Sequence, residues 1–380
     1  MTSPRAAYLL GDLDLVRPLR AARIAVVAVV GSDSSTRYSR AVRSVVPYPP
    51  DDEGALLELL EQHAQRESER PVLYFQDDSD LLLVSRNRER LAQTFHFVIA
   101  DAQLVEDLVD KRLFAQLAQR LQLPVPRAVA VPTNGRRPQP PMQFPVLVKP
   151  LKRDMGWESA TGRAKAVLVS TPGELSALLD RVATRHAHVL AQEHIPGDEN
   201  RIESYHVYVH GDGEIRGEFT GRKLRTLPAA YGHTTALVIT EAPDVAGLGR
   251  SLTRKLGLTG VAKFDFKRGP DGRLHLLEVN PRFNLWHFPG ARAGVNLPAL
   301  VWSDLTDGPR TRSTPARAGV TWCRPWTDSR AARAAGIPLG RWARWAVHCD
   351  ALAVVAWDDP APFVRGEAWQ RVKWRFRGDG

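Results

Sequence analysis

The chain of 380 residues is poor in cysteine and has no long apolar run. Its two cysteines, Cys323 and Cys349, form no Cys-x-x-Cys pair, and its histidines do not cluster at the spacing of metal ligands. The sequence therefore predicts neither a disulfide framework nor a zinc site, and it favours the reducing cytoplasm. The longest apolar run, residues 24–30, has only the length of a strand, so no membrane span is expected. Residues 1–10 lack the cleavage site of a secretory signal.

Lysine is also scarce, although the chain is basic. Only nine of the 52 basic residues are lysines, and the formal net charge is +10. Such an excess serves a nucleic acid or a polyanionic small ligand such as a nucleotide, or it reflects an arginine-rich surface. The arginines are scattered and no aromatic–basic ladder is present, so we expect no nucleic-acid partner. Retention on DNA that weakens with salt would contradict this expectation.

Strands and helices alternate in the first part of the chain. Residues 25–30, 72–75 and 97–100 are apolar runs of strand length, and helices are predicted at residues 53–67 and 88–94. This alternation predicts a parallel sheet with crossover helices. The sequence has no Gly-x-Gly-x-x-Gly motif, so no dinucleotide site is expected.

Hairpins dominate the middle of the chain. An amphipathic helix is predicted over residues 110–121 and a proline-rich loop over residues 132–141. Turn sequences at residues 211–213 and 268–272 separate alternating strands, which indicates two β-hairpins. The tail from residue 309 is rich in tryptophan, and we expect these side chains mainly to pack the fold.

The second hairpin carries the strongest chemical signal. Lys263 and Asp265 share one face of its first strand, because side chains alternate along a strand. On the return strand Glu278 and Asn280 also share a face, and Arg282 follows. Two carboxylates and an amide oxygen are hard ligands of the kind that Mg²⁺ prefers. The alternative is an amphipathic hairpin with a solvated polar face, which does not explain why the polar positions run into Asn-Pro-Arg.

The segment KFDFKRGPDGRLHLLEVNPRF resembles the metal-binding core of ATP-grasp ligases, because the spacing, the hairpin context and the Glu-Val-Asn-Pro-Arg run agree. Three further segments occur in the order of that family: DKRLF, VLVKP and AQEHIPGDEN. The pattern covers about residues 105–305. The segments GDLDLVRPLRAARIAVVAVVG and FNLWHFPGARAGVNLPAL look like a subgroup of carboxylate–amine ligases that resembles D-aspartate ligase.

The resemblance implies a role for each matching residue. The implied ligands of Mg²⁺ (or Mn²⁺) are Asp265, Glu278 and Asn280. The implied catalytic residues, which balance charge on the transferred phosphoryl group, are Lys263 and Arg282. The implied ATP-binding residues are Lys111, Lys149, Gln192, Glu193, Ile195 and Glu199. Candidates for the substrate side are Lys223, Arg225 and His287.

The stretch between Lys149 and Lys165 departs from the family. ATP-grasp ligases usually carry a glycine-rich loop there, whose backbone N–H groups cover the phosphates. This chain has only Gly156 and Gly162 in that stretch. The side chains that could replace the backbone donors are Lys152, Arg153 and Ser159.

The resemblance also implies a fold, mixed α/β and α+β. An N-terminal parallel α/β domain is expected over residues 1–105, followed by a two-lobed ATP-grasp fold with antiparallel sheets. We assign its small lobe to residues 106–200, its large lobe to residues 201–308 and a tryptophan-rich extension to residues 309–380.

The implied activity is the ATP-dependent ligation of a small carboxylate to an amine. An acyl phosphate is the intermediate, and ADP and phosphate are released. The alternatives are a ligase that uses bicarbonate or a non-amine acceptor, and a nucleotide-binding regulatory module without catalysis. Homodimers are common in the superfamily, so a homodimer is the assembly to test. Fold alone does not identify the carboxylate or the amine.

Overall fold

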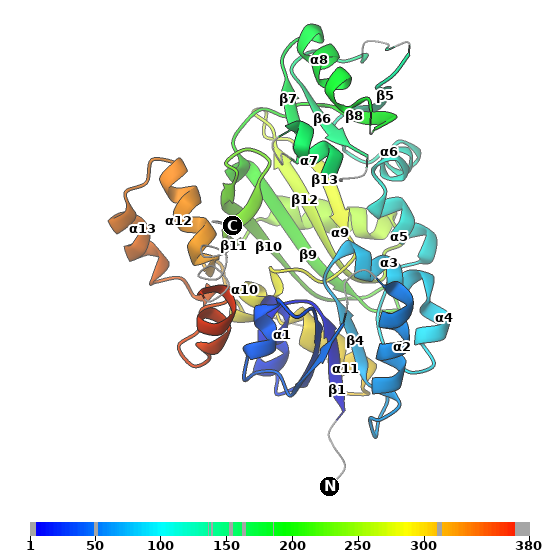
Figure 1. Cartoon of the computed structure of the whole chain (residues 1–380), viewed down its shortest axis with the longest axis vertical. Helices are drawn as coiled ribbons and strands as arrows, with labels where there is room; N and C mark the ends of the chain where they lie inside the picture. Colours follow the sequence, from blue (N-terminus) through cyan, green and yellow to red (C-terminus); the bar gives the residue numbers. More distant parts are fainter. Residues whose placement is uncertain are drawn as a thin grey trace, which may run out of the picture.

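The computed structural model describes residues 5–48, 52–135, 137, 140–151, 155–161, 165–184, 186–309 and 314–368. Figure 1 shows the N-terminal sheet at the bottom, a large sheet in the middle and a small sheet at the top. The predicted combination of a parallel N-terminal sheet with antiparallel sheets is confirmed. Within the described ranges, no helix combines the length and the apolar character that a membrane span requires.

The N-terminal sheet has four parallel strands in the order β3-β2-β1-β4. Its strands are β1 (Ala6–Leu10), β2 (Ala25–Val30), β3 (Ser44–Pro47) and β4 (Val72–Phe75). Its helical segments are α1 (Leu13–Ala21), η1 (Ser35–Tyr38), α2 (Glu53–Ala64), α3 (Asp78–Arg86) and α4 (Arg88–Leu91). β1, β2 and β4 are buried along almost their whole length, which explains their continuous apolar runs.

The strand predicted at residues 97–100 is wrong. This segment joins no sheet, and an isolated parallel bridge links His96 to Val72 just before it. Phe97 and Ile99 pack against one hydrophobic cluster, whereas Val98 packs against another. The segment is apolar because it lies between two clusters, and a short apolar run does not distinguish that position from a strand.

The small lobe is an antiparallel sheet of four strands in the order β5-β8-β6-β7. Its strands are β5 (Ala128–Pro132), β6 (Val146–Pro150), β7 (Val167–Val169) and β8 (His188–Glu193). The helices before and within it are α5 (Ala102–Val109), α6 (Lys111–Arg120), α7 (Met155–Thr161) and α8 (Pro172–Val182). The amphipathic helix predicted over residues 110–121 is confirmed as α6, and the Asp110 side chain caps its N-terminus.

The large sheet has seven strands in the order β13-β12-β9-β10-β11-β14-β15. Its longer strands are β9 (Ile202–Val209), β10 (Ile215–Leu227), β11 (His233–Thr240), β12 (Gly260–Arg268) and β13 (Leu274–Asn280). Its accompanying helices are α9 (Pro243–Lys255), α10 (His287–Arg292) and α11 (Leu297–Leu305). Both predicted hairpins are confirmed, the first as β9 with β10 and the second as β12 with β13.

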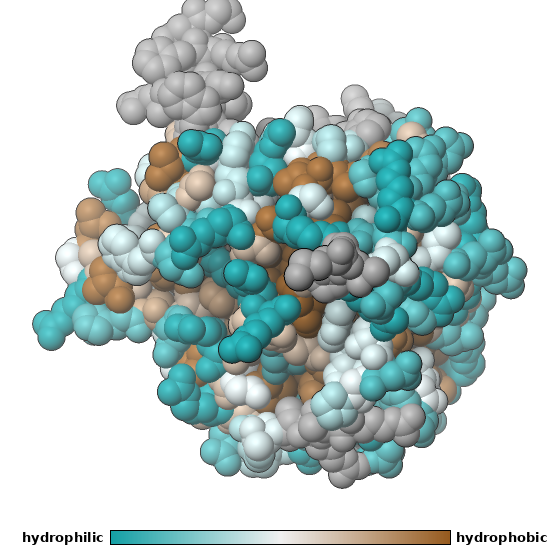
Figure 2. Space-filling model, turned by 90° about the horizontal axis from the view of Figure 1, so that it is seen from below, coloured by the Kyte–Doolittle hydropathy of each residue, from teal (hydrophilic) through white to brown (hydrophobic). Residues whose placement is uncertain are grey.

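Residues 314–368, here called the C-terminal extension, continue the large sheet. β14 (Thr321–Cys323) pairs with β11, and β15 (Ala351–Leu352) pairs with β14. The helical segments of the extension are α12 (Pro325–Ala334), α13 (Leu339–Ala346) and η3 (Pro362–Ala368). α12 and α13 project at the left of Figure 1, and the view from below shows apolar patches on that lobe (Figure 2). Trp322 is fully buried, as expected for a packing tryptophan, whereas Trp357 is 97% exposed.

A buried carboxylate joins the N-terminal part to this extension. Asp14 in α1 is 1% exposed, and its Oδ1 accepts a hydrogen bond of 2.8 Å from Trp322 Nε1. Burial raises the pKa of Asp14 to about 7; Asp12 adds to the rise, while Arg324 and Trp322 oppose it. The folded protein therefore retains this proton at pH values at which the unfolded chain releases it.

We expect Asp14→Asn to remove a pH-dependent loss of stability. The ordinary pKa of this carboxyl is 3.8, so the wild type loses stability as the pH rises from there to about 7. The slope within that window is about 1.4 kcal/mol per pH unit. The melting temperature of the variant minus that of the wild type should therefore rise through the window and then level off. Thermal denaturation across this pH range measures the difference, and a difference independent of pH would contradict the assignment.

Candidate active site

The polar face of the β12–β13 hairpin forms the centre of the site. Asp265 lies directly opposite Glu278 in the ladder, and Lys263 lies opposite Asn280. On the other face of β12, Phe264 is fully buried. The alternation expected from the sequence therefore places the four polar side chains on one face. β12 and β13 run up to the small lobe in Figure 1, so this face lies where the two lobes meet.

Asp265 is a buried carboxylate among cations. It is 2% exposed. Its Oδ2 lies 2.5 Å from Lys263 Nζ and 3.9 Å from Lys223 Nζ. Its Oδ1 accepts a hydrogen bond from the Ser204 hydroxyl. Burial alone would raise the pKa of Asp265, but Lys263, Lys223 and the Ser204 hydroxyl hold it well below the usual range. Asp265 is therefore ionised at any pH at which the protein would work.

The donor atoms of this face fit a magnesium ion in part. Among the described residues, no three His, Cys, Asp or Glu side chains gather as a metal site. Asp265, Glu278 and Asn280 supply two carboxylates and an amide, and Mg²⁺ commonly takes one or two carboxylates and completes its shell with phosphates and water. Glu278 is exposed, and its Oε1 accepts a hydrogen bond of 3.2 Å from Asn280 Nδ2. Because Lys263 occupies one oxygen of Asp265, a metal ion there requires that ammonium group to shift.

A cavity of about 260 Å³ lies between the small lobe and the large sheet, and we call it the inter-lobe cavity. The residues expected to bind ATP all line it: Lys111, Lys149, Gln192, Glu193, Ile195 and Glu199. They come from α6, β6, β8 and the start of η2 (Glu199–Arg201), so the fold brings together segments far apart in the chain. Leu147 and Leu277 add apolar surface, and Asp265 and Glu278 lie at the same cavity.

Two lysines of the inter-lobe cavity are held in place by neutral acceptors. Lys149 Nζ donates to Gln192 Oε1 at 2.7 Å, and Lys111 Nζ donates to the Pro150 carbonyl at 2.6 Å. Burial lowers the pKa of Lys149 to about 8; Glu278 opposes this shift and Lys111 adds to it. Lys149 is thus a cation held by a weak partner, which a phosphate oxygen would replace favourably.

A second cavity of about 490 Å³ lies on the other side of Asp265, and we call it the polar cavity. It shares five lining residues with the inter-lobe cavity: Lys165, Lys223, Gly232, Asp265 and Glu278. It is also lined by Lys263, Asn280 and Arg282, so the carboxylates and cations of the hairpin stand at the junction of two spaces.

Arg282 ties the polar cavity to the N-terminal part of the chain. Its Nε lies 2.5 Å from Asp78 Oδ1, and its Nη1 donates to the Gln76 carbonyl at 2.6 Å. Both partners follow β4, at the carboxyl end of the parallel sheet. The N-terminal part therefore orients the guanidinium group of Arg282, which also lines the polar cavity.

Two predicted substrate residues lie elsewhere in this structure. Arg225 makes two hydrogen bonds to the buried carboxylate of Asp328, at 2.8 and 2.6 Å, and its guanidinium lies 4.1 Å from the ring centroid of Trp345. His287 is fully buried, neither ring nitrogen has a hydrogen-bond partner among the described residues, and burial lowers its pKa to about 3. Neither residue lines the inter-lobe or the polar cavity, whereas Lys223 lines both.

Sequence reasoning missed several residues of the polar cavity. Trp286 and Arg324 line it, together with Thr327 from the first turn of α12 and Thr234 and Thr235 from β11. No motif marks them, because they reach the cavity from separate elements. Arg324 lies in the tail, where the sequence indicated packing tryptophans and no motif.

The expected phosphate loop is only partly described. Lys152, Arg153 and Gly162 lie outside the described residues. α7, which contains Ser159, occupies part of the stretch where the family usually has a glycine-rich loop. The fully buried Trp157 anchors α7 in the core of the small lobe.

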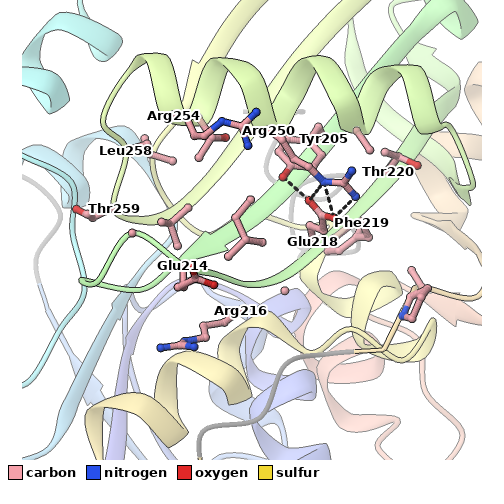
Figure 3. A pocket seen from close by; sticks show the side chains of 18 of the residues that line it. Tyr205, Glu214, Arg216, Glu218, Phe219, Thr220, Arg250, Arg254, Leu258 and Thr259 are labelled. Carbon is pink, nitrogen blue, oxygen red and sulfur yellow. Dashed lines mark hydrogen bonds and ion pairs between the residues drawn. The ribbon is translucent and has the colours of Figure 1, made fainter.

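A further cavity, of about 1080 Å³, lies apart from these residues along α9 and β10 (Figure 3). Glu218 accepts hydrogen bonds there from the Tyr205 hydroxyl at 2.5 Å and from Arg250 Nε at 2.9 Å. Glu218 is thus paired with its neighbours, and this cavity shares no lining residue with the other two. Chemistry rather than volume singles out the junction at Asp265 and Glu278.

Comparisons with known proteins found similar sequences and similar folds. Residues 188–324 match a family model described as "ATP-grasp in the biosynthetic pathway with Ter operon". Among solved structures, N5-carboxyaminoimidazole synthetase from Staphylococcus aureus complexed with ADP has a TM-score of 0.60 at 12% identity, and the match covers 84% of this chain and 80% of that one. The chain is therefore similar to ATP-grasp proteins in sequence over residues 188–324, and its fold is similar to that of the synthetase.

Two relatives are named as ligases of amino acids. A D-aspartate ligase of Enterococcus faecium (strain Aus0004) is 28% identical over 285 residues, which are 71% of this chain and 68% of that protein. The L-amino acid ligase from Bacillus licheniformis is similar in structure, with a TM-score of 0.60 at 15% identity, over 80% of this chain and 74% of that one. The first is a similarity of sequence, and the second is a similarity of fold.

Proposed function

We propose that this chain joins a carboxylate to an amine at the expense of ATP, through an acyl phosphate. The observation that carries the proposal is the junction of the two cavities at Asp265, Glu278 and Lys223. A nucleotide in the inter-lobe cavity and an acid in the polar cavity would meet at these side chains. The relatives named as amino acid ligases support the same chemistry.

In the first step, a carboxylate oxygen of the acid forms a bond to the γ-phosphorus of ATP. The bond from that phosphorus to the β,γ-bridging oxygen breaks, and ADP leaves. Lys149 would neutralise charge on the phosphates, and Lys263 and Arg282 would do so on the transferred group, because such transfers depend mostly on positioning and electrostatics. Asp265, Glu278 and Asn280 would hold magnesium, which would supply positive charge to neutralise the phosphates when it is bound.

In the second step, the amine nitrogen attacks the carbonyl carbon of the acyl phosphate. Phosphate leaves with the electrons of the carbon–oxygen bond, and the nitrogen loses one proton, so the products are an amide, ADP and phosphate. The cations that line the polar cavity, among them Lys263 and Arg282, would stabilise the oxyanion that forms during attack. Exclusion of water from this junction would protect the acyl phosphate from hydrolysis.

Lys149→Met should weaken ATP binding about 10- to 100-fold, because one charge-assisted hydrogen bond is lost while the volume is kept. Titration calorimetry with a non-hydrolysable ATP analogue measures the dissociation constant. Lys255→Met is the matched control, since Lys255 is exposed at the end of α9 and lines none of the three cavities. Equal affinity in wild type and Lys149→Met would show that β6 does not reach the phosphates.

The proposal is tested by ADP release from ATP and Mg²⁺ across a matrix of carboxylic acids and amines, with aspartate among the acids. We expect release that requires one acid and one amine together, with an amide as the product. Release with bicarbonate, or with an acceptor that is not an amine, would replace the carboxylate–amine activity with the alternative ligase. Tight ATP binding without release under any pairing would favour a regulatory module.

A further inference from the structure

The polar cavity carries more positive charge than the chemistry of phosphoryl transfer uses. Its lining includes five cationic side chains and only two acidic ones. Lys223 and Lys263 pair with Asp265, and Arg282 pairs with Asp78. The other two cations are Lys165 and Arg324; Arg324 lies near Asp12 and Asp14 and comes from the C-terminal extension rather than from the hairpin.

Arg324 is held loosely by its acidic neighbours. Its Nη2 lies 3.6 Å from Asp12 Oδ2 and 3.9 Å from Asp14 Oδ2, and both distances exceed that of a hydrogen bond. The side chain is 36% exposed. A carboxylate that enters the cavity can therefore form the two parallel hydrogen bonds that a guanidinium offers, without first breaking a closer contact.

The backbone beneath Arg324 is fixed. Its amide donates to the Thr235 carbonyl at 2.9 Å, and its own carbonyl accepts from the Asp328 amide at 2.9 Å. The fully buried Asp328 carboxylate accepts hydrogen bonds from Arg225 at 2.8 and 2.6 Å, from the Thr235 hydroxyl at 2.8 Å and from Trp342 Nε1 at 2.8 Å. The start of α12 is thus locked to β10, β11 and α13. Such support is what a recognition residue needs, because its binding geometry is set in advance.

We propose that the C-terminal extension is a wall of the substrate pocket and that Arg324 binds a second carboxylate of the acid that is activated. The substrate is then a dicarboxylic acid or an acidic amino acid. This inference rests on the proposed function, since it assumes that the activated carboxylate lies at the Asp265 end of the same cavity. The volume of about 490 Å³ lies within the range of small-molecule pockets, about 300 to 1,000 Å³. Arg225 becomes a positioning residue that acts through Asp328.

The test compares Arg324→Gln with Arg324→Lys, which retains the charge, and with Arg330→Gln. Arg330 is exposed on the same helix and lines none of the three cavities. ADP release is measured with aspartate and with its two monoamides, asparagine and isoasparagine. Whichever carboxylate is activated, one monoamide keeps it and lacks the second. A dicarboxylic acid from the panel replaces aspartate, with its own monoamides, if it is the better substrate.

We expect Arg324→Gln to lower kcat/KM for the dicarboxylate about 10- to 100-fold and to leave that of the active monoamide, and KM for ATP, unchanged. Arg324→Lys should retain part of the activity, and Arg330→Gln should match the wild type. An equal effect of Arg324→Gln on the dicarboxylate and its monoamide would overturn the inference. The inference would also be overturned if the activated acid had a single anionic group, or if kcat/KM fell only when the carboxylate of the acceptor amine is varied.

A binding measurement separates the two proposals. Calorimetry follows aspartate binding to wild type and Arg324→Gln in the presence of a non-hydrolysable ATP analogue. Binding that depends on Arg324 without turnover by the wild type would refute the proposed function and keep the carboxylate site. If the wild type and Arg324→Gln turn over a dicarboxylate equally well, the proposed function stands and the carboxylate site at Arg324 is refuted. No aspartate binding and no turnover would refute both.

Discussion

Glu278→Gln should reduce ADP release to a small fraction of the wild-type rate, by about 10²- to 10³-fold. Glu278 is the exposed carboxylate at the junction of the two cavities, opposite Asp265 in the ladder. A glutamine fills the same volume and still accepts the hydrogen bond from Asn280, so the hairpin should stay intact. The lost charge removes the ligand best placed to hold a divalent ion, because both oxygens of Asp265 already have partners.

Two measurements make this result specific. The variant should require a higher Mg²⁺ concentration for half-maximal release, whereas its affinity for the ATP analogue without Mg²⁺ should equal that of the wild type. Glu58→Gln is the matched control, since Glu58 is exposed on α2 and lines none of the three cavities. If Glu278→Gln has the wild-type rate and magnesium dependence, the assignment of Glu278 as a metal ligand is wrong.

Asp328→Ala should destabilise the extension by about 3 to 5 kcal/mol, because it leaves the Arg225 guanidinium buried without its counterion. Only 16% of the Arg225 side chain is exposed, and within the described residues its guanidinium makes both of its hydrogen bonds to Asp328. Trp342 and Thr235 lose an acceptor at the same time. Hydrogen exchange should show faster opening of α12 and α13, with the N-terminal sheet unaffected.

A double-mutant cycle identifies the cause. Arg225→Met with Asp328→Ala removes both charges, so the pair should be less destabilised than the sum of the two single variants. Additive losses would show that packing, rather than the unpaired charge, accounts for the effect. In either single variant we also expect weaker discrimination between dicarboxylate and monoamide, since Arg324 directly precedes α12 and its carbonyl accepts a hydrogen bond from the Asp328 amide.

The β12–β13 hairpin shows how far a local pattern reaches. A strand period of two places Lys263 and Asp265 on one face, whereas a β-bulge between Asp265 and Phe266 shifts the register and sets which residues of β13 lie opposite them. The strand period and the turn residues act between near neighbours in the chain, so the sequence is sufficient to predict the hairpin, but the pairing of Asp265 with Glu278 depends on the bulge. The same holds for α6, whose N-cap Asp110 and apolar stripe are contiguous. The assignment of the ATP-binding residues came instead from the resemblance, and the fold places all of them at one cavity.

The tail and the substrate candidates could not be predicted in this way. Arg225 is followed by Thr226 on β10. No local sequence pattern predicts that its partner is Asp328, more than a hundred residues later. His287 is close in sequence to the polar run but points into the core. A charge or an imidazole has the same sequence signature whether it lines a cavity or is buried behind one. The difference is made by which distant element packs against it.

By itself, the sequence determined the strands and helices with clear periodicity, and which polar side chains share a face within each strand of the hairpin. The tertiary structure alone decided that β14 extends the large sheet, that Asp14 is buried against Trp322, and that Arg324 lines the polar cavity. The physical reason is the distance along the chain over which each effect acts. Hydrophobic period and turn chemistry act over a few residues, whereas burial and charge pairing depend on contacts between segments that the chain order leaves far apart.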